Sequence, residues 1–520
     1  MSDTAATQGT RRTTLVILGI TIVTGCTYVV MASYNYMVTP MLADLGLTAE
    51  QASLALKIPS LASLLVVFLA GRMGDRLGHR RIIILLSIPF IIGCFIVSIA
   101  QDLPAVMIGM FIEGVAGTAI EIIALGLLVS YFVSPEQRNK AFAVQGVAYP
   151  AVFLVFPVLA GWLITYVSWR VIPFVWVAGG IVILLAAMFA FPPAQRREPL
   201  GEPWTPLLAG VVAVCMVQLI GHSADYGVRS LPTLVSAVGV VVSSVVLVIV
   251  YRRTTEPSLS IAPLRNGATS LLLIVVILVP LLNTLYYLMI AFQYMYQATA
   301  LEAAIYLVPS QVAGILGALF VSDRLSDRIG LRKAGTLLLL LLAAVMSMSL
   351  FFSGTTPLWV MVVYGTLLGF VIMTSDVIVL NAVMSSGPDD EGGNTAAFET
   401  SAEQVGAAFG IVLMGSLVFG VGQMSLENGL EQAGLPPDEA ASVMSDIQQN
   451  SASPELMSQY SYPLPDGGDV TDLEKQAIAD GLRVNGAAGI VISLVAAGLF
   501  AIHRRGIDEE EDSVTSDAEG

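Results

Sequence analysis

Long apolar runs separated by short polar segments restrict the possible folds of this chain more than any other feature. Each run ends at charged or Pro/Gly-rich residues, and the runs are 14–38, 50–70, 82–100, 104–131, 141–166, 170–191, 204–220, 232–251, 268–296, 301–322, 334–353, 357–384, 395–420 and 483–503. An α-helix needs about 20 apolar residues to cross the hydrocarbon core of a bilayer. Because the runs are continuous rather than alternating, they favour helices over a β-barrel. We therefore predict an all-α, polytopic membrane protein with 14 transmembrane helices.

Composition excludes several other classes of protein. Only 12% of the 520 residues are charged, against about 25% in soluble globular proteins. The net charge of −15 argues against nucleic-acid binding. The sequence has no Gly-Lys pair of a phosphate-binding loop, no H-E-x-x-H and no G-x-S-x-G, and the three Cys residues have no C-x-x-C spacing. We expect no cofactor, no metal site and no enzymatic activity.

The distribution of basic residues predicts the orientation in the membrane. If the N-terminus is cytoplasmic, 19 of the 24 Lys and Arg residues fall in cytoplasmic segments, as the positive-inside rule requires. The first run is too long for a signal-peptide core and reads as an uncleaved first span. We therefore expect a multi-pass protein of the cell membrane with both termini in the cytoplasm.

A motif occurs twice, once in each half of the chain. The segment GRMGDRLGHRR at 71–81 aligns with DRLSDRIGLRK at 323–333, and each copy lies between two apolar runs on the cytoplasmic side. Gly78 and Gly330 permit a tight turn, and the Arg residues suit the anionic inner surface of the membrane. Asp75 and Asp327 can pair with Arg or face the N-terminus of another helix. The plainer alternative is a basic loop that only sets topology.

This arrangement resembles the major facilitator superfamily, whose G-x-x-x-D-R-x-G-x-R-[RK] motif follows the second helix of each half. Two six-helix halves around an extra helix pair are similar to the fourteen-helix drug/proton antiporter branch, as is Trp169-Arg170 before the sixth run. The resemblance implies pseudo-symmetric halves and the following plan: a cytoplasmic N-terminus 1–13, a first bundle 14–191, a linker with two extra spans 192–267, a second bundle 268–503 including an outside loop 421–482, and an acidic cytoplasmic tail 504–520.

The resemblance also implies a cytoplasmic gate. In the superfamily, the Asp of the motif contacts the start of a helix in the opposite half, which here is the run 395–420 for Asp75 and 141–166 for Asp327. The second copy departs from the motif at its first position, where Asp323 replaces Gly. The implied gate residues are Gly71, Asp75, Arg76, Gly78, Arg80, Asp327, Arg328, Gly330 and Arg332.

The coupling residues of the antiporter branch are replaced in this chain. The branch usually has an Asp in the first helix, and the corresponding residue is Met31. The usual Arg of the fourth helix is Met110, and its Gln is Glu113. The usual Arg near the start of the thirteenth helix is Glu403. The resemblance thus implies that a protein of this fold is a transporter. Proton antiport is implied by the architecture alone, because the usual coupling residues are replaced.

Polar residues within the apolar runs are candidates for the coupling and substrate sites, because burying an ionisable group in a membrane costs about 3 kcal/mol. Glu113 and Glu121 lie eight residues apart in the run 104–131 and can face one cavity at different depths. The alternative is a structural hydrogen bond to a neighbouring helix. Aromatic and amide groups suit an amphipathic or cationic substrate, although an interfacial aromatic belt also explains about half of them. The other candidates are Asp376, Glu399, Glu403, Asn35, Tyr36, Asn283 and Tyr287.

These features lead to a hypothesis and two alternatives. We expect a monomeric exporter of small amphipathic compounds, surrounded by lipid and driven by a coupling ion, most simply H⁺. An importer or facilitator of a polar solute is the alternative within transport. A non-transporting sensor or assembly partner, with 421–482 as its binding module, is the alternative from another class. We expect this segment to be partly helical, with an amphipathic stretch at 435–449.

Overall fold

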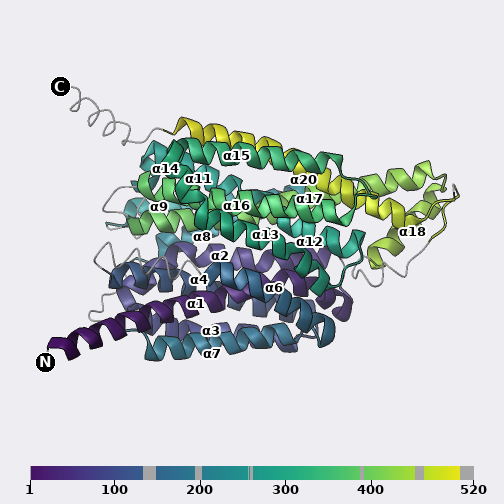
Figure 1. Ribbon diagram of the computed structural model, residues 1–520. Helices are drawn as coiled ribbons and strands as arrows, with labels where there is room; N and C mark the ends of the chain where they lie inside the picture. Colours follow the sequence, from purple (N-terminus) through teal and green to yellow (C-terminus); the bar gives the residue numbers. More distant parts are fainter. Residues whose placement is uncertain are drawn as a thin grey trace, which may run out of the picture.

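The chain folds into a bundle of long helices. The computed structural model describes residues 2–47, 49–132, 148–193, 202–255, 257, 262–386, 392–450, 462–465 and 467–503. Within these residues the elements are helices, apart from one isolated β-bridge between Pro463 and Asp469. Figure 1 shows that most helices run along a common direction, side by side. The prediction of an all-α fold is confirmed.

The described residues of the first half form six helices. They are α1 (Ser2–Leu45), α2 (Ala49–Leu77), α3 (His79–Ile99), α4 (Leu103–Tyr131), α6 (Ala148–Tyr166) and α7 (Val171–Phe189). Local sequence explains several of their ends. At the start of α4, the Asp102 carboxylate accepts a hydrogen bond of 2.9 Å from the backbone N–H of Ala105, and Pro104 occupies the first turn, where its missing N–H costs nothing.

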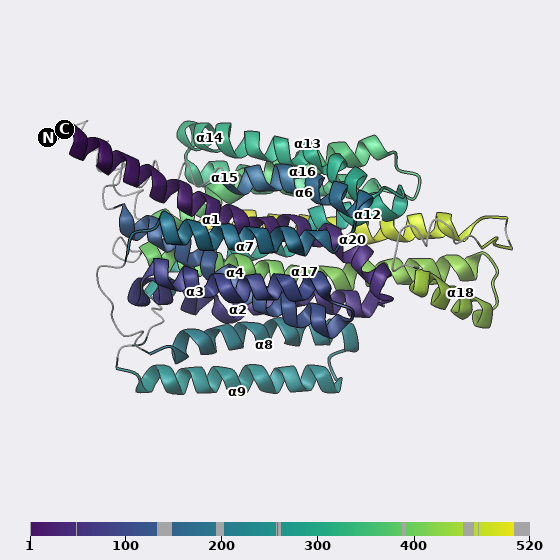
Figure 2. The ribbon, with the colours of Figure 1, turned by 90° about the horizontal axis from the view of Figure 1, so that it is seen from below.

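Two further helices, α8 (Trp204–Tyr226) and α9 (Leu231–Arg253), follow the first half. Figure 2 shows this pair at one edge of the bundle, with α9 outermost. The Ser230 hydroxyl caps α9 by accepting a hydrogen bond from the backbone N–H of Thr233. The prediction that 204–220 and 232–251 form two separate spans is confirmed, and the turn between them is shorter than expected.

The second half begins with a short helix, α10 (Ala262–Arg265), and its first span is interrupted. That span consists of α11 (Gly267–Leu278), a 3₁₀ turn η1 (Pro280–Leu282) and α12 (Thr284–Met295). The remaining elements are α13 (Ala300–Phe320), α14 (Ser322–Ile329), α15 (Leu331–Ser347), η2 (Met348–Phe351), α16 (Leu358–Ser386), α17 (Gly392–Gln432), α18 (Pro437–Asn450) and α20 (Val470–Ile502).

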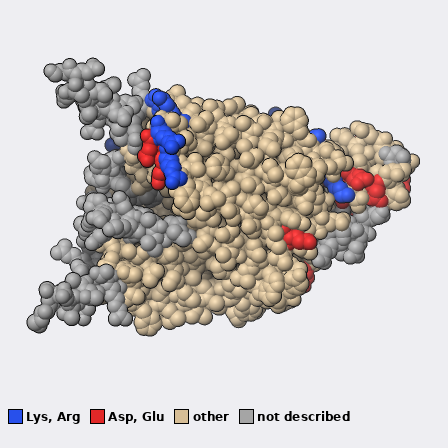
Figure 3. Space-filling view, in the orientation of Figure 1, with Lys and Arg blue, Asp and Glu red and all other residues tan. Residues whose placement is uncertain are grey.

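The predicted number of spans is confirmed. In the described part of the chain, 13 helical segments are long and apolar enough to cross a membrane, and Pro150–Tyr166 is a shorter apolar helix. Each of these fourteen segments overlaps one of the fourteen predicted runs, and the last two extend beyond their runs toward 421–482. On the face drawn in Figure 3, Lys, Arg, Asp and Glu lie near the two ends of the bundle, and the broad middle carries none of them. Such an uncharged belt suits the hydrocarbon core of a bilayer.

Each half has its own hydrophobic core. One buried cluster runs from Val16 to Phe191, and a second runs from Leu272 to Phe500. The second cluster also contains Tyr36 from the first half. The halves meet where α2 packs against α17 and where α6 packs against α13. Two cores with matching interfaces confirm the two pseudo-symmetric halves, whereas the domain limits stay a prediction.

The two ends of the bundle differ. The N-terminus of α1 and the C-terminal end of α20 lie at one end, on the left of Figure 1, which we call the termini end. At the opposite end, which we call the α18 end, α17 and α20 continue beyond the other helices and α18 packs beside them. The 41 residues of α17 span about 60 Å, twice the hydrocarbon thickness. The expectation of helical structure in 421–482 is confirmed, because α18 lies within it and α17 and α20 extend into it.

Candidate functional site

Four carboxyl groups from both halves gather between α4, α16 and α17. Glu121 of α4 lies within electrostatic range of Glu403 of α17, and Glu403 is also within range of Asp376 of α16 and of Glu399. Asp376 and Glu403 are exposed, whereas Glu121 and Glu399 are half-buried. The arrangement therefore places ionisable groups between the halves, where they remain accessible. We call these four residues the carboxyl cluster.

Two hydroxyl groups take part in the carboxyl cluster. The Tyr28 hydroxyl of α1 hydrogen-bonds to the carboxyl group of Glu121. The Thr400 hydroxyl donates a hydrogen bond of 3.4 Å to Oε2 of Glu399. Hydrogen bonds of this kind hold a carboxyl group in one orientation. Tyr28 thus connects the first helix of the chain to the cluster.

Glu113 has a different environment from Glu121, although both belong to α4. Its side chain is 6% exposed, and its Oε1 atom lies 2.9 Å from the position that a Cβ atom would occupy at Gly117. Phe90 of α3 lies 3.3 Å from the same position. Glu113 is therefore enclosed beside α3, while Glu121 faces the second half.

Tyr34 of α1 compensates for a proline in α2. Pro59 has no N–H, so the carbonyl of Ala55 lacks its normal helical partner. The Tyr34 hydroxyl donates a hydrogen bond of 2.7 Å to this buried carbonyl. The Tyr34 ring also packs against Trp176, whose Nε1 donates to the Ser33 hydroxyl at 2.9 Å. Tyr34 is therefore a structural residue within the first half.

The first span of the second half breaks at Asn283. This residue has a φ of 44°, in the left-handed region, and Pro280 precedes it. The backbone N–H of Tyr286 bonds to the Asn283 carbonyl instead of the Leu282 carbonyl. The Leu282 carbonyl accepts a hydrogen bond of 2.9 Å from Nδ2 of Asn485, a residue of α20 that is 1% exposed. A polar side chain from another helix thus stabilises the break.

Glycines of α17 allow it to approach this break closely. A Cβ atom at Gly406 would clash with the carbonyl oxygen of Ile277, and one at Gly410 would lie 2.5 Å from the carbonyl oxygen of Leu281. Backbone atoms cannot move aside as a flexible side chain can. Small residues at these two positions are therefore required for the packing.

The aromatic and amide candidates of the two first helices lie in different surroundings. Tyr36 is buried and packs into the core of the second half, so it bridges the halves. Asn35 is half-buried. Tyr287 is 2% exposed and packs edge-on against Tyr286 and Phe419. Its hydroxyl has no hydrogen-bond partner among the residues that the structure describes.

The halves contact each other near both ends of the bundle. Toward the α18 end, the Thr39 hydroxyl of α1 donates a hydrogen bond of 3.4 Å to Oε1 of Gln293 in α12. Gly161 of α6 lies against the backbone of Leu301 in α13, with 2.7 Å between its Cβ position and the Leu301 Cα. Nearer the termini end, the rings of Phe68 and Phe398 are 6.1 Å apart.

Glycines make the turn of each repeated motif. Gly78 joins α2 to α3 with a φ of 92°, and Gly330 joins α14 to α15 with a φ of 82°, conformations that favour glycine. Arg80 donates a hydrogen bond of 2.7 Å to the carbonyl of Met188, in the last turn of α7, and so caps that helix. The second copy is a helix, α14, rather than a loop.

The positions of the remaining gate residues do not test the predicted latch. Gly71 lies 4.0 Å, measured from its Cβ position, from Ile122 of α4, and Arg76 is half-buried. Asp327, Arg328 and Arg332 are exposed. The side chain of Asp75 lies outside the described residues, as does the start of the fifth apolar run. The latch therefore stays a prediction.

One cluster of contacts was not expected from the sequence. At the α18 end of the first half, the carboxylate of Asp44 accepts a hydrogen bond of 3.0 Å from Nε1 of Trp169 and lies 3.1 Å from Arg170. The Arg170 guanidinium stacks on the Trp169 ring at 4.4 Å. These contacts tie the end of α1 to the α6–α7 turn. The Trp169-Arg170 pair is recognisable in the sequence, but its partner Asp44 lies 125 residues from Trp169 along the chain.

The described part of the chain contains no group of three or more His, Cys, Asp or Glu residues arranged to hold a metal ion. The carboxyl cluster is therefore not arranged as a metal site among these residues. Its accessible carboxyl groups, three of which lie within electrostatic range of the fourth, Glu403, suit proton binding and attraction of a cation. A helical bundle with two halves and an ionisable site between them defines the class of secondary transporters.

Comparison with known proteins identifies the family. Residues 20–411 match the family model of the Major Facilitator Superfamily, and this chain belongs to that family. A solved structure with a TM-score of 0.60 is a bacterial homologue of the human lysosomal transporter Spinster, in an inward-facing and unoccupied conformation. It is 14% identical, and the alignment covers 95% of this chain and 97% of that one. This likeness concerns the fold.

Similar sequences include export and efflux proteins. The chain is 25% identical over 459 residues to the tetracenomycin C resistance and export protein of Streptomyces glaucescens, covering 85% of this chain and 82% of that protein. It is 20% identical over 447 residues to the multidrug efflux pump LfrA of Mycolicibacterium smegmatis, covering 85% and 86% respectively. The expected membership of a drug-export branch agrees with these relatives.

Proposed function

We propose that this transporter exports small amphipathic compounds and that a proton gradient drives it by alternating access. The carboxyl cluster is the single observation that carries the proposal, because it joins groups of both halves at one place. The direction of transport is supported by relatives that are named for export and efflux. In this proposal the protein acts as a monomer in the cell membrane and catalyses no chemical reaction.

The proposed coupling follows from the positions of Glu121 and Glu403. Two nearby carboxyl groups hold one proton between them more favourably than they carry two negative charges side by side. When the cavity opens to a compound with a cationic end, that charge replaces the proton. Proton release on one side and compound release on the other then become parts of one cycle. Tyr28 keeps the Glu121 carboxyl group in place through its hydrogen bond.

The proposed orientation has both termini in the cytoplasm and α18 outside. The positive-inside count supports it, and Arg80, Arg328 and Arg332 then all lie on the cytoplasmic side. In this orientation, the contact of Gly161 with Leu301 belongs to an outer gate, and the contact of Phe68 with Phe398 belongs to an inner gate. The repeated motifs lie beside the inner gate, which is where the proposed latch of Asp75 would act.

The substitution Glu121→Gln tests the coupling. In sealed vesicles with an imposed pH gradient, we expect Glu121→Gln to abolish gradient-driven accumulation and to leave downhill exchange partly intact. Glu113→Gln is the matched control on the same helix, since Glu113 is enclosed beside α3, and it should have a weaker effect. If both variants concentrate the compounds as the parent does at every pH, coupling lies elsewhere, and Asp376 is the next group to test.

A further inference from the structure

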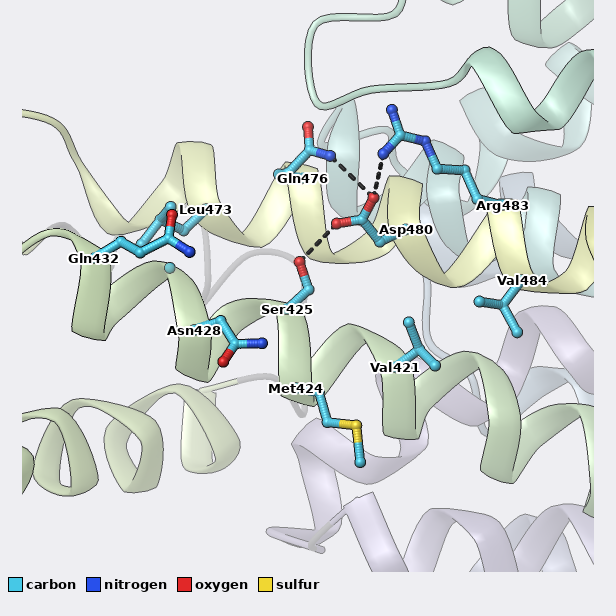
Figure 4. Close-up of a pocket in the computed structure, with 11 residues that line it drawn as sticks. Val421, Met424, Ser425, Asn428, Gln432, Leu473, Gln476, Asp480, Arg483 and Val484 are labelled. Atoms are coloured by element: carbon cyan, nitrogen blue, oxygen red, sulfur yellow. Dashed lines mark hydrogen bonds and ion pairs between the residues drawn. The ribbon is translucent and has the colours of Figure 1, made fainter.

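A pocket lies outside the proposed transport path, between the extended ends of α17 and α20 at the α18 end. Its volume is about 530 Å³, within the range of sites for drug-sized ligands. Figure 4 shows side chains from both helices around it. Six polar side chains line the pocket, and they are Ser425, Asn428, Gln432, Gln476, Asp480 and Arg483.

The two helices are held together by a seam of glycines beside the pocket. The Cβ position of Gly481 lies 2.8 Å from the carbonyl oxygen of Val418, and that of Gly422 lies 3.2 Å from the carbonyl oxygen of Ala477. The polar side chains of α17 recur at positions three to four residues apart, so they form one stripe along the helix. This stripe lies beside the glycine seam.

A hydrogen-bond network shapes one wall of the pocket. Asp480 accepts hydrogen bonds from the Ser425 hydroxyl at 2.6 Å, from Nε2 of Gln476 at 3.0 Å and from Arg483 at 2.6 Å. Figure 4 shows these three bonds meeting at Asp480. The Oε1 atom of Gln476 accepts a further bond of 2.9 Å from the backbone N–H of Gly354. The wall is therefore preorganised, and its carboxylate is already neutralised by Arg483.

Some polar groups of the pocket remain available to a ligand. The Nε atom of Arg483 is buried and has no hydrogen-bond partner among the described residues. Asn428 and Gln432 are exposed side chains on the stripe of α17. Amides offer both donors and acceptors, whereas the Arg Nε group offers a donor. Met424 and Leu473 supply apolar contact at the pocket, and a thioether adapts well to flat rings.

The charges nearby narrow the class of ligand. Asp480 and Arg483 compensate each other, and Lys475 pairs with Asp472 at 3.7 Å. Glu427 and Glu431 on α17 leave an excess of negative charge around the pocket, which disfavours anions. We infer that this pocket binds amphipathic compounds that carry no negative charge and whose polar edge has hydroxyl or carbonyl groups. It serves as an external site on the way out for the compounds that the protein exports, and only this last role rests on the proposed function.

Cysteine protection in purified protein tests the pocket directly. A single Cys is introduced by Asn428→Cys, and the protein is placed in lipid nanodiscs so that both sides are accessible. The parent is the blank, because its three Cys residues lie in the spans. The panel contains uncharged hydroxylated aromatic ketones and amides with their carboxylate analogues. We expect uncharged members to slow maleimide modification at 428 and the carboxylates to have no effect. Gln423→Cys, exposed on the same helix away from the pocket, should not be protected.

Binding measurements with leucine variants provide the second readout. We expect Asn428→Leu and Gln432→Leu to weaken binding about fivefold each, since each removes one neutral hydrogen bond. Gln423→Leu, the matched control, should bind like the parent. If no panel compound protects position 428, the pocket inference is wrong, whatever the transport assay gives. If the compounds are transported but do not protect position 428, the proposed function still holds. If the compounds protect position 428 but are not transported, the result supports the pocket inference and contradicts the proposed function.

Discussion

The substitution Gly410→Ala tests whether close packing of α17 against the broken span is required. A Cβ atom at this position would lie 2.5 Å from the carbonyl oxygen of Leu281 and 2.9 Å from its Cα and C atoms. Ordinary contact needs a separation about 1 Å larger, so α17 must shift away from η1. Overpacking of this kind costs about 1–3 kcal/mol, and the better helix propensity of alanine returns up to about 1 kcal/mol.

Gly420→Ala on the same helix is the control with the opposite expected sign. A Cβ atom at Gly420 meets nothing within 4 Å, so only the propensity gain of up to about 1 kcal/mol remains. Thermal unfolding of both variants in one detergent should therefore lower the Tm for Gly410→Ala and keep or raise it for Gly420→Ala. If the two variants shift the Tm by the same amount in the same direction, the contact with Leu281 does not restrict the residue at position 410.

Three further predictions concern a buried hydrogen bond, the repeated motif and the orientation in the membrane. Tyr34→Phe should lower the stability by about 1–3 kcal/mol, because the buried carbonyl of Ala55 loses its hydrogen bond, and an unchanged Tm would contradict this. Asp75→Asn should reduce transport severely at normal abundance in the membrane, and unchanged transport would reduce the motif to a topology signal. Single cysteines in 325–332 should react only from the cytoplasm and those in 440–470 only from outside, so external labelling of 325–332 would overturn the proposed orientation.

Much of the fold follows from the sequence because the bilayer imposes strict local conditions. A segment that crosses hydrocarbon must be apolar and long enough, and its backbone must bond within the segment. Each of the fourteen runs therefore overlaps a helical segment, and the polar residues 221–231 predict the turn between α8 and α9. The repeated motif likewise predicts tight turns, and Gly78 and Gly330 both have positive φ. The spans and the tight turns depend on residues that are close to one another in the sequence.

The tertiary structure alone decided which distant groups meet. Glu113 and Glu121 look alike in the sequence, yet only Glu121 lies close to Glu403, more than 250 residues away along the chain. The break at Asn283 depends on a hydrogen bond from Asn485 to the carbonyl of Leu282, 203 residues away along the chain. The shapes of the helix surfaces and the closeness of their approach determine which distant residues meet. The local pattern of apolar residues does not contain this information. The positions of the spans were therefore predictable, and so were the candidate carboxyl groups, whereas which of these groups come together and where the outer pocket lies were not.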